Sequence, residues 1–293
     1  MGWAIRASEQ VDRDWRLRSR FVLSALTDRS AAARLRDAGP QSPIGGLLRE
    51  WPDAVGYLLW PYQCSAWGAG ERISRIEGHL EALGALPGLK LEPDEKLVLL
   101  DTGSISPDTC LIIDRPKWLA REGLLTLSLF KGDFRAFTLS FSFFNPAELE
   151  LFIGGLQGRQ DEDILSLYRD LTKDFHGMRP RDFLLEALRL FAIPVGARHL
   201  YAVADAYKIS RHEYFGKRGA PGLYYDEIWE ERGGVRVAPT HFELPLGGTR
   251  RDLEQVASKK RAMYRRRYEM LDQIAAAMPR DFTAAERRRF DAK

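Results

Sequence analysis

The stretch that decides the fold covers residues 149–180 and reads LELFIGGLQGRQDEDILSLYRDLTKDFHGMRP. It opens with an apolar run at residues 149–153 that is typical of a buried strand and that breaks at Gly154-Gly155. Apolar residues then recur at helical spacing, at Ile164, Tyr168, Leu171 and Phe175. The stretch therefore predicts a strand, a glycine turn and a helix.

A glycine turn that opens a helix often binds a phosphate group, because the unpaired N–H groups of the first helical turn point at the ligand. Acidic residues at 161–163 would satisfy the positive end of the helix and repel a phosphate, so a tight structural turn is the alternative. Neither a Walker lysine nor GxGxxG spacing is present. The residues expected to line a phosphate site are Gly154, Gly155, Gln157, Gly158 and Arg159.

Length and composition limit the class of protein. With 293 residues, 45% of them hydrophobic, the chain is long enough for one large or two closely packed globular domains. The net charge is +3, but basic residues gather near the C-terminus, where they would attract RNA, CoA or an anionic lipid. Cys64 and Cys110 fit neither a metal site nor a disulfide framework. Without a signal peptide or a membrane-length apolar run, a cytoplasmic protein is expected.

Residues 1–95 are expected to form an N-terminal helical cap. Helical periodicity covers residues 12–48 and resumes after an aromatic block at 58–67, on a helix with one apolar face. His79 lies beside that face, and we expect it to be a satisfied partner within the cap rather than a ligand contact.

Residues 96–293 are expected to form a mixed-sheet core that ends in a basic helix. Gly132-Asp133 lies between two alternating runs and predicts an antiparallel hairpin. Five β-rich runs open this region, at residues 96–101, 109–114, 123–130, 135–144 and 149–155. Later elements are a helix from Pro180, a buried strand at 199–206, a helix at 224–232, a strand at 240–246 and a long helix at 252–277.

This order of elements resembles the core of the GNAT N-acyltransferases, in which an antiparallel series gives way to a crossover helix. The resemblance implies an α/β (α+β) fold with a mixed, largely antiparallel sheet. It also implies that the pyrophosphate of acyl-CoA binds at the glycine turn. The additional helix at Pro180 departs from the GNAT pattern.

Several segments are similar to the VirK/YbjX family, a domain of unknown function in proteobacterial proteins. That family is linked to virulence and to resistance against host peptides, and the resemblance implies no settled biochemical activity. The matching stretches are Pro61-Tyr62 with Trp67, Arg72 and His79, then residues 153–158, 171–180, 225–229 with Gly233-Gly234, and 258–268.

The C-terminal helix carries two basic residues on its apolar face. Lys260 and Arg267 are therefore expected to hold an anion in a cleft beside the glycine turn, with Tyr264 contacting the substrate. Asp161, Glu162 and Asp163 are the expected partners of the two cations. The alternative is that the aliphatic parts of Lys260 and Arg267 pass the edge of the core and place their charges in solvent. The apolar face is formed by Leu253, Val256, Met263, Tyr264, Met270, Leu271 and Ile274.

Two further groups are candidates for the chemistry. His176 and Arg179 lie between two helices, where a histidine with a pKa near neutrality can exchange protons with an amine. Asp226 is a second candidate for proton exchange, and Tyr225 and Trp229 would form an aromatic wall for the substrate. The alternatives are structural, since His176 can cap the preceding helix and the other residues can cap or pack.

The sequence thus predicts an acyltransferase that moves an acyl or aminoacyl group from a phosphate-bearing carrier to an amine acceptor. Acyl-CoA, acyl carrier protein or aminoacyl-tRNA would be the carrier, and no cofactor is expected to be tightly bound. The alternative is a non-enzymatic module that binds an anionic polymer or lipid through the basic helix. No metal site and no GxSxG serine hydrolase motif are present.

Overall fold

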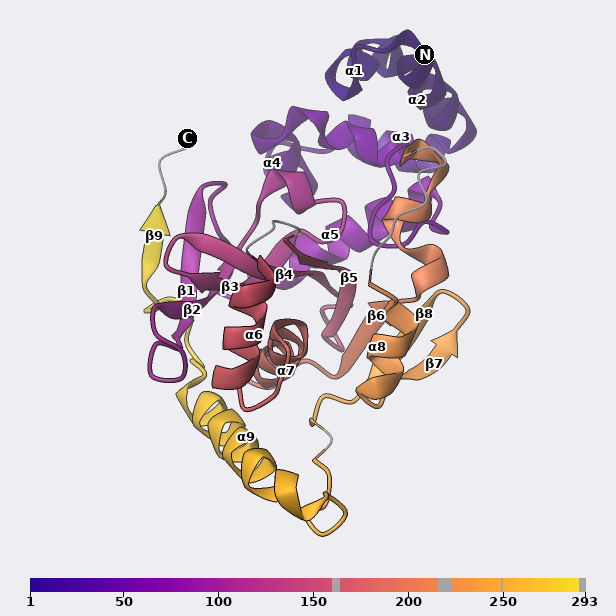
Figure 1. The fold of residues 1–293 in the computed structure, drawn as a ribbon. Coiled ribbons are helices and arrows are strands. Elements are labelled where there is room, and N and C mark those ends of the chain that lie inside the picture. The colour runs from indigo at the N-terminus through magenta and orange to yellow at the C-terminus, as the bar shows by residue number, and fades with distance from the viewer. Residues whose placement is uncertain (160–163, 216–222, 249, 290–293) are drawn as a thin grey trace.

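In the computed structural model, which describes residues 1–159, 164–215, 223–248 and 250–289, nine strands form one central sheet (Figure 1). Their order across the sheet is β7-β8-β6-β5-β4-β3-β2-β1-β9. All neighbours are antiparallel except β5 and β6, which are parallel. The mixed, largely antiparallel fold predicted from the sequence is therefore confirmed. The strands are β1 (Glu95–Asp101), β2 (Thr109–Asp114), β3 (Leu125–Lys131), β4 (Phe134–Phe144), β5 (Glu150–Gly158), β6 (His199–Val203), β7 (Val235–Ala238), β8 (His241–Leu244) and β9 (Arg287–Arg289).

A two-helix crossover joins the parallel strands. After β5 the chain forms α6 (Ile164–Asp174) and α7 (Pro180–Ala192), and it then enters β6 beside β5. Pro180 occupies the first turn of α7 as predicted, where its missing N–H breaks no helical hydrogen bond. Helix α7 packs on the sheet through Phe191, whose ring centroid lies 6.0 Å from that of Phe141 on β4.

The N-terminal helices gather around a hydrophobic cluster of their own, which includes Phe21, Leu58 and Tyr62. Helix α5 joins this cap to the sheet. Its His79 is buried, and Nδ1 of that ring accepts a hydrogen bond of 3.1 Å from the N–H of Phe143 on β4. His79 is therefore a satisfied structural residue as predicted, but its partner lies in the sheet and not within the cap. The elements are α1 (Gly2–Val11), α2 (Trp15–Thr27), α3 (Arg29–Arg36), α4 (Pro43–Glu50), the 3₁₀ helix η1 (Pro52–Leu58) and α5 (Ala69–Ala85).

The C-terminal third departs from the prediction in three places. Strands β7 and β9 were not expected, and both are short and largely exposed. The last helix, α9 (Ser258–Ala277), begins six residues later than predicted. Before it, α8 (Tyr225–Glu231) ends as expected at Gly233, whose φ of +78° suits glycine.

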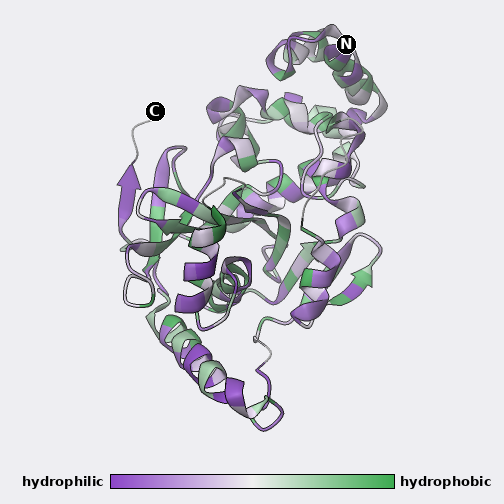
Figure 2. Ribbon diagram, viewed as in Figure 1, coloured by the Kyte–Doolittle hydropathy of each residue, from purple (hydrophilic) through white to green (hydrophobic). Residues whose placement is uncertain are grey.

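Helix α9 is attached to the body along a narrow strip. Figure 2 shows it as a largely hydrophilic helix, and within it Met270 and Ile274 are buried. The apolar face predicted from the sequence is turned toward the body, but only Val256, Met270 and Ile274 are buried. Leu253, Met263, Tyr264 and Leu271 are half-buried, Lys260 is exposed, and Leu253 and Val256 precede the helix. Among the helices of the described chain, none combines the length and the apolar character needed to cross a membrane.

Candidate functional site

The glycines of the central stretch lie within β5 and do not form a turn. Gly155 pairs with Ser140 on β4 and Ile153 pairs with Phe141, which leaves Gly154 as the extra residue of a bulge. A Cβ atom at Gly154 would lie 2.1 Å from the carbonyl oxygen of Glu122. The expected phosphate-binding turn at residues 154–158 is therefore wrong, because these glycines allow the Glu122 segment to pack directly on the strand.

The carboxyl group of Glu122 is enclosed beside this bulge. Its Oε1 accepts a hydrogen bond of 2.6 Å from Nε2 of Gln157, and its Oε2 is buried without a hydrogen-bond partner in the described chain. Oε1 of Gln63 and Oγ of Ser140 are also buried and have no partner in hydrogen-bond geometry. We call Gln63, Glu122, Ser140 and Gln157 the Glu122 cluster. The Ser140 hydroxyl lies close enough to the Glu122 carboxyl to lower its pKa, although the two do not meet in hydrogen-bond geometry. Buried polar atoms without a hydrogen-bond partner are unusual in a protein interior and are typical of a site that binds water or a polar ligand.

The enclosure changes the acidity of Glu122. Burial raises the pKa of its carboxyl to about 7, and the nearby side chains of Gln157 and Ser140 oppose that effect to a smaller degree. A carboxyl that titrates near neutrality can take up a proton and release it again at physiological pH. Nothing in the sequence pointed to this residue, because one acidic side chain in a loop belongs to no periodic pattern.

Tyr225 and Trp229 hold α8 against the sheet. The pairing of β5 with β6 ends at Ile153 and Ala202, and the Tyr225 hydroxyl lies just beyond that point. It accepts a hydrogen bond of 2.7 Å from the N–H of Leu156 and donates one of 3.1 Å to the carbonyl of the same residue. Trp229 is fully buried and donates to the carbonyl of Val203 at 2.8 Å. Both predicted substrate residues are therefore engaged within the fold.

The two residues expected to exchange protons lie in different parts of the molecule. Asp226 accepts a hydrogen bond from the N–H of Asp205 at 2.7 Å and forms an ion pair with Arg236 at 2.5 Å, so both of its carboxylate oxygens are occupied. His176 lies at the turn between α6 and α7 with a φ of +51°. Its N–H bonds to the carbonyl of Lys173, and this closes the end of α6 as the capping alternative predicted.

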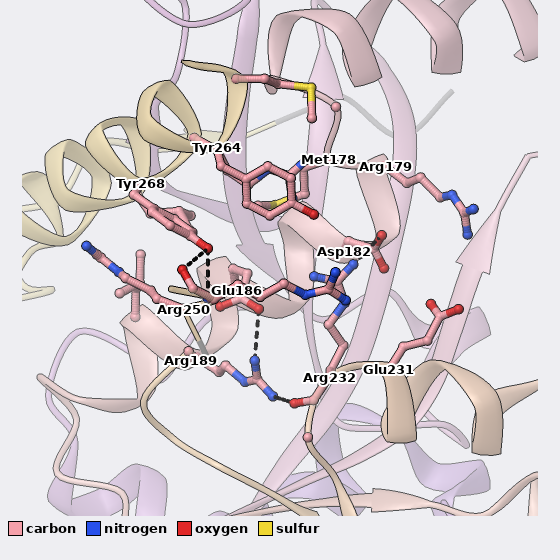
Figure 3. A pocket seen from close by; sticks show the side chains of 18 of the residues that line it. Met178, Arg179, Asp182, Glu186, Arg189, Glu231, Arg232, Arg250, Tyr264 and Tyr268 are labelled. Carbon is pink, nitrogen blue, oxygen red and sulfur yellow. Dashed lines mark hydrogen bonds and ion pairs between the residues drawn. The ribbon is translucent and has the colours of Figure 1, made fainter. Parts of the chain in front are cut away.

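A pocket of about 690 Å³ lies where α7, the end of α8 and the loop before α9 meet α9 itself (Figure 3). We call it the α9 pocket. It brings together four residues that the sequence predicted as binding residues, namely Arg179, Lys260, Tyr264 and Arg267. No residue of β5 lines it, so the expectation that Lys260 and Arg267 lie beside the glycines is wrong. Their expected partners at 161–163 lie outside the described residues.

Buried ion pairs form the floor of the α9 pocket. Arg189 lies 2.8 Å from Glu186 and also donates to the carbonyl oxygen of Arg232 at 2.7 Å (Figure 3). The guanidinium of Arg232 lies 2.6 Å from the carboxylate of Asp182. Positions 182, 186 and 189 share one face of α7 at helical spacing. That spacing is visible in the sequence, but no role was predicted for these three residues.

A second pocket, of about 640 Å³, lies between the cap and the segment that carries Glu122. We call it the cap pocket. Arg121 lines it and stacks on the ring of Trp60 at 4.4 Å. Its other lining residues include Trp51, Tyr57, Trp118, Glu122 and Phe215. Trp60 of the aromatic block therefore lines this pocket together with aromatic residues from outside the block, which the sequence did not predict.

Arg159 is the remaining predicted residue, and it is exposed where the chain leaves β5. Its N–H donates to the hydroxyl of Tyr168 at 2.8 Å, and its guanidinium lies 5.7 Å from the centroid of the Phe134 ring. Within the described part of the chain, no group of three or more His, Cys, Asp or Glu side chains is arranged to hold a metal ion.

Comparison with known proteins identifies the family. The description "Protein of unknown function (DUF535)" covers a family that matches residues 10–280. The chain belongs to this DUF535 family. It is 41% identical over 129 residues to "Uncharacterized protein YbjX" of Escherichia coli (strain K12), a match that covers 44% of this chain and 39% of that protein. The predicted resemblance to the VirK/YbjX family is therefore confirmed.

Two proteins of Haemophilus influenzae are also similar, and both are described as "Uncharacterized protein". One is 35% identical over 150 residues, which cover 48% of this chain and 46% of that protein. The other is 29% identical over 190 residues, which cover 62% of this chain and 63% of that protein. The chain thus spans less than two thirds of the length of each of these relatives. No solved structure matches it.

Proposed function

We propose that this protein is an acyltransferase that moves an acyl or aminoacyl group from a phosphate-bearing carrier to an amine. The strand order supports a GNAT-like arrangement, because an antiparallel series β1–β5 gives way through a helical crossover to the parallel neighbour β6. Such a likeness concerns the fold alone, and a function needs support from a site.

The observation that carries the proposal is the carboxyl of Glu122. It lies against Gly155 of the bulged strand, where a Cβ atom would come within 2.0 Å of its Oε2, and that oxygen has no partner in the described chain. An amine must lose a proton when it attacks a carbonyl carbon, and a carboxylate with a pKa of about 7 suits the role of acceptor. Glu122 is better placed for this role than Asp226, whose two oxygens are both occupied.

The proposed reaction is the transfer of an acyl group from the carrier to the amine nitrogen. The amine nitrogen forms a bond to the carbonyl carbon of the carrier ester or thioester, and Glu122 accepts the proton that the nitrogen loses. The bond from that carbon to the carrier oxygen or sulfur then breaks, and the carrier leaves as an alcohol or thiol after taking the same proton from Glu122, which is thereby restored to its carboxylate form. Backbone N–H groups at the bulge would stabilise the negative charge on the carbonyl oxygen.

The two pockets would then have different roles. The cap pocket extends to Glu122 and is walled by aromatic side chains, which suits an amine acceptor with an apolar body. Arg159, at the exit of β5, is exposed and can contact a phosphate of acyl-CoA, acyl carrier protein or aminoacyl-tRNA. These carriers occur in the cytoplasm, and the proposal places the protein there.

The test is a transfer assay with the full chain. Acyl-CoA, acyl carrier protein and charged tRNA are each incubated with a mixture of amines, and new amides are detected by mass spectrometry. We expect one carrier to lose its acyl group in the presence of the wild-type protein, and Glu122→Gln to lower the rate by roughly 100-fold or more. Glu227→Gln, an exposed change on α8, is the matched control. Absence of transfer from all three carriers would contradict the proposal.

A further inference from the structure

The α9 pocket carries more positive charge than its own residues neutralise. On its floor, Asp182 pairs with Arg232 and Glu186 pairs with Arg189. A buried ion pair of this kind is complete in itself, because each charge has an opposite charge within hydrogen-bond distance. The floor therefore leaves none of its own carboxylates for the other basic residues of the pocket. Glu230 and Glu231 also line the pocket, and Glu231 lies 3.5 Å from Arg181, but the basic side chains that line it still outnumber the acidic ones.

Four of those residues have no carboxylate partner within the described chain, namely Arg179, Arg251, Lys260 and Arg267. Arg251 and Lys260 line the pocket, and no interaction of either side chain with another residue occurs there. Arg267 uses its Nε and Nη2 to donate hydrogen bonds of 3.2 and 2.9 Å to the carbonyl oxygen of His176. Those two bonds hold its guanidinium at the pocket and leave its charge uncompensated.

The cations converge on a recess, because one face of α9 closes the pocket. That face consists of Lys260, Met263, Tyr264, Arg267, Tyr268 and Leu271, which recur every three or four residues. Lys259, Arg265 and Arg266 lie on the remaining faces of the same helix, are exposed and do not line the pocket. A polymer or a lipid surface would contact those outer residues first, whereas a small molecule would enter the recess.

The lining also offers apolar and aromatic surface. The guanidinium of Arg267 lies over the Tyr264 ring, 4.5 Å from its centroid, so a cation–π contact holds the two side chains together. Met263, Leu190 and Leu271 add apolar area nearby. A volume of about 690 Å³ falls in the range of pockets that bind small molecules.

We propose that the α9 pocket binds a small organic phosphate with at least two negative charges, whose phosphate oxygens contact Lys260, Arg251 and Arg267. The organic part of the ligand lies against Tyr264 and the apolar residues beside it. This inference does not depend on acyl transfer, because the pocket is separate from the Glu122 cluster. Tyr225 opens α8 at the cluster, and Arg232 follows the end of α8 at the pocket.

The test measures binding of inorganic pyrophosphate, ATP and citrate to the full chain by calorimetry at constant ionic strength. We expect pyrophosphate and ATP to bind at one site, ATP more tightly, and citrate to bind at least tenfold more weakly than ATP. Lys260→Ala should weaken ATP binding about tenfold, which is the loss expected for one charge-assisted contact. Lys259→Ala removes the same charge from the next residue and should leave the affinity within about twofold.

Three results would overturn the proposal. The first is absence of saturable binding of both pyrophosphate and ATP. The second is an equal loss of affinity in Lys259→Ala and Lys260→Ala, which would indicate a diffuse electrostatic effect. The third is tight binding of citrate, which would indicate a site for carboxylates. Binding of heparin or anionic vesicles that is lost in Arg265→Ala with Arg266→Ala, in a protein that does not bind ATP, would assign the basic helix to a polymer or membrane instead.

Discussion

The Glu122 cluster and the α9 pocket both gather polar groups away from bulk water, but they balance them in opposite ways. In the α9 pocket the buried acids are paired with arginines, and the uncompensated charge lies on α9 and on the loop before it. In the Glu122 cluster the enclosed atoms themselves lack partners. An enclosed acid without an opposite charge shifts its pKa, whereas a paired acid keeps its charge and anchors the fold. The Glu122 cluster therefore suits proton transfer, and the α9 pocket suits the binding of a ligand.

The largest effect is expected from breaking the floor of the α9 pocket. Arg189→Ala leaves the Glu186 carboxylate buried without its partner, and we expect the free energy of unfolding to fall by about 3–5 kcal/mol. Urea denaturation followed by circular dichroism measures this change. The control is Arg250→Ala, which breaks the exposed ion pair with Asp272 and should cost less than about 1 kcal/mol. If both variants lost the same free energy of unfolding, the buried ion pairs of the floor would be no more important to stability than the exposed pair of Arg250 and Asp272.

Replacing Glu122 in the other site should raise the free energy of unfolding instead of lowering it. Because the folded state holds the Glu122 proton more tightly than the unfolded state, stability falls as the pH rises from the usual range of a glutamate to the folded pKa of about 7. Because glutamine does not titrate, Glu122→Gln removes this loss of stability at high pH. We expect the variant to be more stable than the wild type by roughly 2–3 kcal/mol near pH 8, and about equally stable near pH 4. Urea midpoints at the two pH values measure the difference, and a pH-independent difference would contradict the account.

A smaller effect is expected from filling the space beside Glu122. Gly155→Ala places a Cβ atom 2.0 Å from Oε2 of that residue, so either the side chain or the strand must move. We expect a loss of about 1–3 kcal/mol in the free energy of unfolding. Gly84→Ala on α5 is the matched control, because its Cβ meets nothing within 4 Å and alanine favours the helix. A thermal melt of both variants would decide whether the bulge is as tightly packed as the structure indicates.

Much of the fold could be predicted because local patterns determined it. The β-rich runs form β1 to β5, and Pro180 opens its helix. The edge strands β7 and β9 could not be predicted in this way, because their exposed residues show no alternation of apolar and polar side chains. The glycines of β5 were interpreted as a turn because glycine usually breaks a strand. Here they remain in the strand because a distant segment, with Gln63 and Glu122, packs on them.

The candidate sites were likewise predictable only where a local pattern determined them. Helical spacing placed Lys260, Tyr264 and Arg267 on one face of α9, and they do line one pocket. Tertiary packing determines which elements lie beside that face. They are α7 and the end of α8, and not β5. Glu122 lay beyond prediction, since its significance comes from three segments that are far apart in the sequence.

The most direct test of the central claim is a titration of the Glu122 carboxyl itself. The protein is labelled with ¹³C at its glutamate carboxyl groups, and the signal absent from Glu122→Gln is followed with pH by NMR spectroscopy. The account predicts a midpoint near 7, because burial outweighs the hydrogen bond from Gln157. A midpoint in the ordinary range of an exposed glutamate, about 4.3, would show that the carboxyl is solvated and would contradict its assignment as the proton acceptor.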